Sequence, residues 1–151
     1  MNAGSGNASS YRLQADGAAR GNPGPAAFGY VIVAPSGEEV ALEGKAIGTT
    51  TNNVAEYSGL IGGLEKALAL GVTRLDIRMD SELVVRQMAG RYRVKHPGLV
   101  PLFRRARGLV EKLESWTIAH VPREQNARAD FAANLALDQA LAVRKDMESA
   151  R

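Results

Sequence analysis

The sequence predicts an α/β domain of three layers, in which helices flank a mixed five-stranded sheet. Three strand-like segments follow one another near the start of the chain, and helical segments then alternate with two further strands. This order, βββαβααβα, combines a hairpin sheet with right-handed crossovers between parallel strands. The chain has 151 residues, which fits one domain able to bury about 68–70% of its unfolded surface.

The first three strands are predicted from apolar segments that are separated by turn residues. Together they are expected to form a meander. The segments are 11–15, which runs into Asp16-Gly17, then 27–33 and 40–47, with Pro35-Ser36-Gly37 as the turn between the last two.

The later elements are bounded by capping and breaking residues. Thr50 to Asn53 supply N-cap chemistry for a long amphipathic helix that ends at Leu70-Gly71, whereas Ser81 begins a short helix that Gly90 stops. The other segments are a strand over 74–79, an irregular basic connection over 91–98, a helix from Leu99 or Pro101 to about 113, a strand over 115–121 and a last helix over 126–142. We expect a flexible tail over residues 1–10, one domain over 11–142 and a frayed tail over 143–151.

Four acidic residues, Asp16, Glu56, Asp80 and Asp130, stand where a predicted strand or helix begins or ends. Glu56 lies one turn before Leu60 on the apolar stripe of the long helix, and Asp130 has the same place on the last helix. Desolvating an ionised carboxylate costs several kcal/mol unless a positive charge compensates it. The two helix acids therefore indicate a shared cation, and the two strand acids complete its ligands.

The strand order favours a common site for these acids. If the first and fourth strands are parallel neighbours, Asp16 and Asp80 meet at the carboxyl ends, where open α/β sheets commonly bind ligands. A pair of divalent cations about 3.5–4 Å apart clamps the attacking and leaving oxygens of a phosphodiester, and Mg²⁺ suits such a site because it accepts a few carboxylates and keeps waters. For any one of the acids alone, a helix cap or a solvated strand end is the ordinary explanation.

Composition excludes several classes of protein. The chain has no cysteine, which rules out disulfides and thiolate metal sites and places magnesium or manganese ahead of zinc. No run approaches 18 apolar residues, and the first ten residues lack the basic and apolar regions of a secretory signal. We therefore expect a soluble, cytoplasmic protein.

Positive charge is concentrated in one stretch, although the net charge is only +3. Between Leu83 and Val110 the chain carries no acid, and such a block attracts polyanions. The alternative is that the last three of these residues form the solvated face of a helix. The basic residues of the stretch are Arg86, Arg91, Arg93, Lys95, Arg104, Arg105 and Arg107.

Taken together, these motifs resemble type 1 ribonuclease H over about residues 11 to 140. The resemblance implies the ribonuclease H-like fold and an endonuclease that cuts the RNA strand of an RNA–DNA hybrid by two-metal catalysis, leaving 5′-phosphate and 3′-hydroxyl ends. It also implies two Mg²⁺ ions, with Mn²⁺ as a substitute, held by Asp16, Glu56, Asp80 and Asp130 as catalytic residues. The motifs are Asp16-Gly17, Arg20 to Gly29 (RGNPGPAAFG), Thr50 to Asn53 with Glu56, Met79-Asp80-Ser81, and Asn126 with Ala129-Asp130.

The same resemblance implies the contacts with the nucleic acid. Asn22 and Thr51 match positions that hold a DNA-strand phosphate, and Asn52 and Asn53 match positions that reach into the minor groove, where an A-like helix displays its 2′-hydroxyls. Helix capping is the alternative for Asn52 and Asn53, and both roles can coexist.

Two further positions have open roles under the resemblance. Ser81 either caps a helix or contacts the groove. Gly17 either lets the backbone approach the RNA strand or forms a plain turn.

Three departures from the family pattern stand out. Glu82 replaces a glutamine that touches bases in well-studied bacterial members. The connection at 122–125 is shorter than the histidine-bearing loop of many relatives, and Arg123 or Glu124 is the candidate replacement for that histidine. His120 is read as structural and His96 as a loop residue. The short connection at 91–95 matches the compact branch of the family, which lacks the extended basic protrusion.

Two rival functions remain open at this point. One is a nuclease of the same fold that cuts DNA, which Asn52, Asn53 and the complete acid set disfavour. The other is a non-catalytic module that binds hybrids, or a domain fused to a polymerase or phosphatase, which retention of all four acids disfavours. We expect a monomer that binds RNA–DNA hybrid and no membrane.

Overall fold

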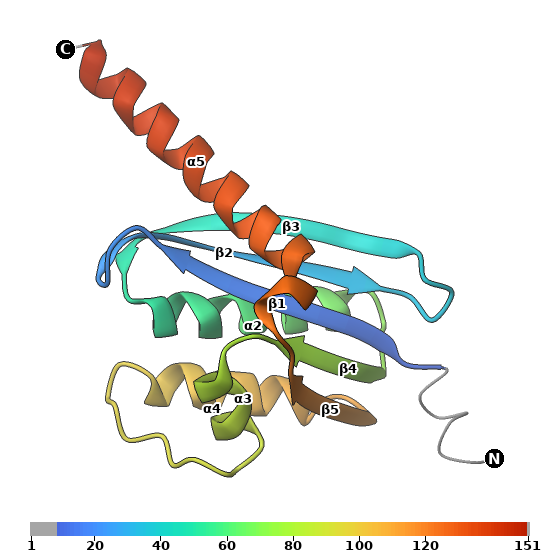
Figure 1. The fold of residues 1–151 in the computed structure, drawn as a ribbon. Helices are drawn as coiled ribbons and strands as arrows, with labels where there is room; N and C mark the ends of the chain where they lie inside the picture. Colours follow the sequence, from blue (N-terminus) through green and yellow to red (C-terminus); the bar gives the residue numbers. More distant parts are fainter. Residues whose placement is uncertain (1–8, 151) are drawn as a thin grey trace.

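The predicted three-layer α/β architecture is confirmed in the computed structural model, which describes residues 9–150 (Figure 1). The first eight residues of the expected flexible tail lie outside this range. The sheet has the order β3-β2-β1-β4-β5, with antiparallel pairing among the first three strands and parallel pairing of β1 with β4 and of β4 with β5. The strands are β1 (Tyr11–Ala19), β2 (Gly24–Val33), β3 (Glu39–Thr50), β4 (Arg74–Met79) and β5 (Ser115–His120).

Helices cover both faces of this sheet. On one face lie α2 (Asn52–Ala69), α3 (Glu82–Met88) and α4 (Val100–Val110), and on the other lies α5 (Ala127–Ser149) (Figure 1). A short 3₁₀ helix, η1 (Arg123–Gln125), leads from β5 into α5.

The main hydrophobic core lies between the sheet and α2, α3 and α4. Leu13 of β1 and Ile77 of β4 are fully buried against Leu60 and Leu64 of α2, and Val110 of α4 belongs to the same cluster. Because side chains alternate along a strand, the neighbours of these apolar residues on β1 and β4 face the α5 side. By the same alternation, the side chain of Asp16 in β1 lies on the α5 side.

Helix α5 lies directly on the backbone of the sheet. A Cβ atom at Gly29 would come within 2.4 Å of the backbone nitrogen of Ala133 and 2.5 Å of the carbonyl oxygen of Ala129. Only glycine fits under a helix at this distance, and the helix meets it with small buried alanines. This close contact brings the first turn of α5, with Asp130, next to β1.

Several element boundaries differ from the sequence prediction, and the largest differences are at the ends of β1 and α5. Strand β1 continues to Ala19 because its last residues still pair with β2. Helix α5 continues to Ser149 where a frayed tail was predicted from residue 143 on. The added turns consist mostly of good helix formers, and Arg144 pairs with Glu148 at 3.5 Å. Within residues 9–150, no helix combines the length and the apolar character needed to span a membrane.

Candidate active site

The strand register brings the first pair of acids together. Parallel pairing of β1 with β4 ends at Ala15 and Met79, so Asp16 and Asp80 are the residues that follow the last pair on the two strands. Asp16 itself still pairs with Gly29 of β2. The sequence predicted Asp16 at the end of the strand, but the residue lies inside β1. It does stand where the parallel pairing with β4 stops.

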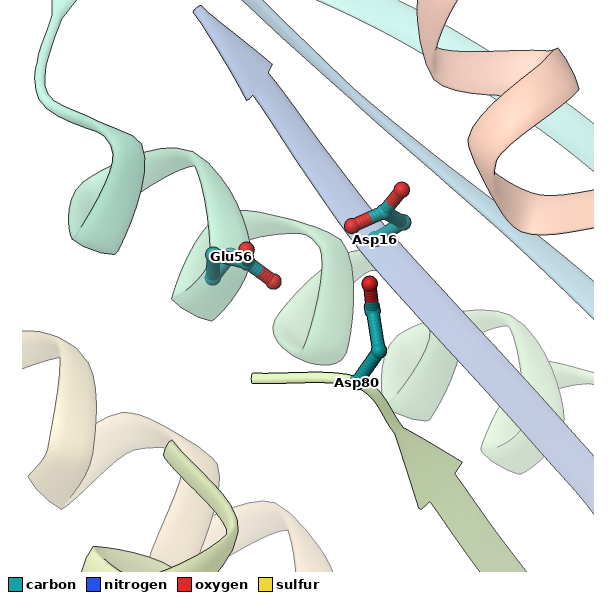
Figure 2. A group of neighbouring side chains, drawn as sticks. All are labelled: Asp16, Glu56 and Asp80. Atoms are coloured by element: carbon teal, nitrogen blue, oxygen red, sulfur yellow. The ribbon is translucent and has the colours of Figure 1, made fainter. Parts of the chain in front are cut away.

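Three of the four predicted acids converge at this edge. One carboxylate oxygen each from Asp16, Glu56 and Asp80 lies within 4.8 Å of the other two. Figure 2 shows the three side chains approaching one another from β1, from α2 and from the end of β4.

Asp130 is not part of this close group, but it lines the same cavity of about 420 Å³. Its Oδ1 accepts a hydrogen bond of 3.1 Å from Nδ2 of Asn134, one turn further along α5. The cavity therefore presents all four predicted acids, three of them with carboxylate oxygens within 4.8 Å of one another.

For two of the three acids, Asp16 and Glu56, the surroundings disfavour the charged form. Burial, followed by repulsion from Glu56 and Asp80, raises the pKa of Asp16 to about 9, and only 4% of this residue is exposed. Burial and then Asp80 raise the pKa of Glu56 to about 8. Among the described residues, Oε2 of Glu56 is buried and accepts no hydrogen bond. Converging oxygens of this kind fit a hard divalent cation, which would compensate their charge.

Asn126 orients one of these acids, and the sequence analysis assigned it no role in the site. Its side chain is 1% exposed, and its Nδ2 donates to Oδ1 of Asp80 at 2.8 Å and to the carbonyl oxygen of Ala15 at 3.0 Å. Asn126 precedes α5 but makes no side-chain cap bond there. Its place in the motif with Asp130 was the available signal, and capping was the more obvious interpretation of an asparagine at that position.

Gly17 has a packing role that the sequence did not indicate. A Cβ atom at this position would come within 2.4 Å of the backbone of Ala55 and Glu56. The glycine lies within β1, so it does not form a turn. It allows α2 to approach β1 closely enough for Glu56 to reach Asp16.

The predicted nucleic-acid contacts divide between two cavities. Asn52 and Gly17 line the acid cavity, whereas Asn22, Thr51 and Asn53 line a second cavity of about 210 Å³. The cap of α2 is Thr51, whose Oγ1 accepts from the backbone nitrogen of Val54 at 3.3 Å. Capping is therefore not the role of Asn52, which is the exposed first residue of the helix.

The remaining candidate residues differ in whether they line one of the two cavities. Ser81 is the N-cap of α3, because its Oγ accepts from the backbone nitrogen of Val84 at 3.3 Å. Arg123 lines the acid cavity, and Glu124, its neighbour in η1, does not. His120 is exposed in β5 and lines neither cavity, whereas His96 is a loop residue, as predicted, that lines the second cavity.

Some basic residues of the stretch contact an acid or an aromatic ring, whereas others have no ion-pair partner among the described residues. Arg86 pairs with Glu82 at 2.7 Å and Arg105 with Glu65 at 2.8 Å. Arg107 lies 5.3 Å from the ring centre of Trp116. By contrast, three exposed residues of the 91–98 connection have no ion-pair partner in the described part of the chain. These are Arg91, Arg93 and Lys95.

Comparisons with known proteins identify the family of this chain. Residues 14–136 match the family described as reverse transcriptase-like. Ribonuclease HI of Halobacterium salinarum is 49% identical over 125 residues, which cover 83% of this chain and 63% of that protein. Its crystal structure superposes with a TM-score of 0.83 at 46% identity, over 85% of this chain and 98% of that one.

Two other solved structures are similarly close. The N-terminal ribonuclease H domain of Rv2228c from Mycobacterium tuberculosis has a TM-score of 0.86 at 45% identity, over 89% of this chain and 98% of that one. LC11-RNase H1 in complex with an RNA/DNA hybrid has a TM-score of 0.82 at 43% identity, over 87% and 99%.

These matches define the class of protein. The chain belongs to the type 1 ribonuclease H family, as its motifs predicted. It spans only about a third of some relatives, such as the bifunctional protein Rv2228c, of which the matched region covers 35%.

Proposed function

We propose that this chain is an endoribonuclease that hydrolyses the RNA strand of RNA–DNA hybrids and leaves 5′-phosphate and 3′-hydroxyl ends. The observation that carries the proposal is the convergence of Asp16, Glu56 and Asp80 within 4.8 Å at the end of the parallel ladder. The hybrid seen in the complex of LC11-RNase H1, 43% identical to this chain, supports the choice of substrate.

The acids are suited to hold two Mg²⁺ ions, for which Mn²⁺ can substitute. Asp16, Glu56 and Asp80 would supply the close ligands, and Asp130 would supply a further one from α5. When bound, such cations activate a water molecule and neutralise charge that develops on the phosphate.

The other residues of the cavity act on the acids and on the substrate. The hydrogen bond from Asn126 fixes the orientation of Asp80. Asn52 lies at the cavity wall with Gly17, where an RNA strand positioned over the acids would pass. Arg123 places a positive charge at the same wall, where it can attract the phosphate backbone or help a cleaved product leave.

A substrate panel tests the proposal. Labelled RNA–DNA hybrid, duplex DNA and duplex RNA are incubated with the protein in Mg²⁺, with and without chelator. We expect cleavage of the hybrid alone, in the RNA strand, only without chelator, and with ends that a ligase and a phosphatase identify as 5′-phosphate and 3′-hydroxyl. Cleavage of duplex DNA would support the rival nuclease, and binding of hybrid without cleavage would support the non-catalytic module.

We also propose that the protein is a monomer. Sedimentation velocity measures its oligomeric state.

A further inference from the structure

A third cavity, of about 270 Å³, lies near the start of β1. It is lined by Arg12 of β1, by Asp76 and Arg78 of β4, and by residues of the turn between β2 and β3. Because side chains alternate along a strand, Arg12 is on the same face of the sheet as Asp16, about 13 Å away along β1. The residues that line the third cavity differ from those of the two cavities described above.

Helix α5 leaves this end of the sheet open. Its first turns pack on Gly29 of β2, and its later residue Leu141 lines a cavity with Pro25, further toward the start of that strand. Arg12 instead pairs with Val33, the last residue of β2. The helix therefore runs away from the end of the sheet that holds the third cavity (Figure 1).

Arg12 has an unpaired donor at this cavity. In the described part of the chain, only two buried side-chain nitrogen or oxygen atoms lack a hydrogen-bond partner, Oε2 of Glu56 and Nε of Arg12. Arg12 also has no ion-pair partner within residues 9–150. A buried donor of a charged group costs free energy when it is left unpaired. At the acid cavity the unpaired atom is an acceptor and indicates a cation, so the unpaired donor of Arg12 indicates an anion.

The neighbouring acid does not compensate Arg12. Asp76 lies beside Arg12 in the register of β1 and β4, but its two oxygens contact other residues. Oδ2 accepts from Nε and Nη2 of Arg78 at 3.2 and 2.8 Å, and Oδ1 accepts from Oγ1 of Thr117 at 3.3 Å. This contact leaves Nη1 of Arg78 for another partner. Two guanidinium groups and one carboxylate therefore line the cavity, and one positive charge is uncompensated.

We propose that the third cavity binds a phosphate ester, with the phosphate on Arg12 and Arg78 and the organic part against the turn. A guanidinium group presents several N–H donors in a fixed fork that matches phosphate oxygens. Donors from two such groups can reach different oxygens of a tetrahedral phosphate, whereas a carboxylate offers only two oxygens. Val33, Ala34 and Pro35 line the cavity beside the arginines, and their apolar side chains suit the organic part of an ester.

An NMR titration of ¹⁵N-labelled protein tests this site in the absence of Mg²⁺ and of hybrid. The probes are inorganic phosphate and adenosine 5′-monophosphate, and the controls are sodium chloride and sodium acetate at the same ionic strength. We expect the Nε–H signal of Arg12 to shift in a saturable way with both phosphates. The nucleotide should bind several-fold more tightly than the inorganic ion, because its organic part covers apolar surface. Chloride and acetate should give smaller shifts without saturation.

Variants assign the binding to the two arginines. Arg12→Gln should weaken binding of the nucleotide about tenfold or more, since a hydrogen bond between charged groups is lost. Arg12→Lys keeps the charge without the fork and should restore only part of the affinity. Arg78→Gln perturbs the site from the other strand, so the test stands even if the Arg12 variants do not fold. Arg74→Gln is the matched control on β4, because Arg74 pairs with Glu114 at 2.9 Å and does not line this cavity.

A dinucleoside monophosphate then identifies the source of the phosphate. Tighter binding of this diester than of the mononucleotide assigns the site to a nucleic-acid strand, and the reverse assigns it to a free nucleotide. Either result supports a site for a phosphate ester.

Three results would overturn the inference. The Arg12 signal could stay unmoved by every phosphate, it could move equally with chloride, or nucleotide affinity could be unchanged in both Arg12→Gln and Arg78→Gln. None of these results depends on cleavage of hybrid, which the substrate panel tests separately. A failure of this inference is therefore distinguishable from a failure of the proposed function.

Discussion

The two cavities beside the first turn of α2 have opposite hydrogen-bonding character. Among the described residues, the acid cavity holds a buried acceptor that lacks a donor, Oε2 of Glu56. The second cavity holds donors whose acceptor partners in the same side chains are already engaged, as in Asn22 and Thr51. The charge of the ligand that a cavity fits can therefore be inferred from whether its unpaired polar atoms are hydrogen-bond donors or acceptors.

Substitutions in the two cavities are expected to affect the stability of the folded protein differently. The carboxylates of the acid cavity repel one another, so a substitution there removes activity and relieves strain. The donors of the second cavity are neutral and more exposed, so a substitution there affects binding with little effect on folding, except at Thr51, which also caps α2.

The largest effect is expected from neutralising an acid. Asp80→Asn preserves the shape and can keep the hydrogen bond from Asn126, but it removes a metal ligand. We expect hybrid cleavage in Mg²⁺ to fall by about a hundredfold or more, and Asp16→Asn should behave alike, while thermal stability is equal or higher. Asp76→Asn is a matched control on the same strand. Full activity of Asp80→Asn would contradict the metal-binding role.

The stability of the metal-free protein should depend on pH in a way that reflects the acid cavity. The folded state holds the pKa of Asp16 at about 9 and of Glu56 at about 8, above their ordinary values of 3.8 and 4.5. Folded protein thus binds more protons than unfolded protein over this range, and the free energy of unfolding falls as pH rises from about 4 to about 9.

Thermal denaturation in chelator at several pH values measures this slope. Asp16→Asn should flatten it, and added Mg²⁺ should raise stability most at high pH. Stability that does not change with pH between about 5 and about 8 would show that the pKa values of these acids are not raised in the folded state.

The unpaired cations of the 91–98 connection should contribute affinity that depends on salt. Each phosphate contact adds about 0.9 to the slope of log affinity against log salt, so replacing Arg91, Arg93 and Lys95 by glutamine should reduce the slope by up to about 2.7. Fluorescence anisotropy at several salt concentrations measures it. Arg104→Gln with Arg105→Gln, on the exposed face of α4, is the comparison. An equal change in both variants would assign the effect to net charge alone.

A smaller effect is expected at Asn53. Because Thr51 is the cap of α2, Asn53→Ala should leave thermal stability unchanged or slightly raised, since alanine is the better helix former. Hybrid affinity should nevertheless fall several-fold. Thr51→Val is the contrast, because loss of a cap costs about 0.5–2 kcal/mol. Calorimetry beside a binding titration separates these effects, and unchanged affinity of Asn53→Ala would remove it from the interface.

Much of this arrangement could be predicted from the sequence. Element order and the identity of the four acids followed from apolar periodicity and from acids placed on apolar stripes. The residues that arrange the acids could not be found in the same way, because their role depends on contacts between distant segments. Gly17 is required by the approach of α2, and Asn126 reaches a strand more than a hundred residues earlier in the chain.

The sequence also did not show that the predicted nucleic-acid contacts divide between two cavities. Asn52 and Asn53 are adjacent, yet they line different cavities, since successive residues of a helix point in directions about 100° apart. His96 had no distinguishing pattern around it. Only the folded loop places it beside Asn22.

Proton release on metal binding tests the central claim most directly. Mn²⁺ or Mg²⁺ is titrated calorimetrically into the wild type at pH 7, in two buffers of different ionisation enthalpy. Since raised pKa values keep Asp16 and Glu56 largely protonated at pH 7, binding must displace protons. We expect release of roughly one to two protons, about one from each of these acids, and a smaller release from Asp16→Asn. Binding heats that are the same in both buffers would contradict a cavity of protonated acids built for cations.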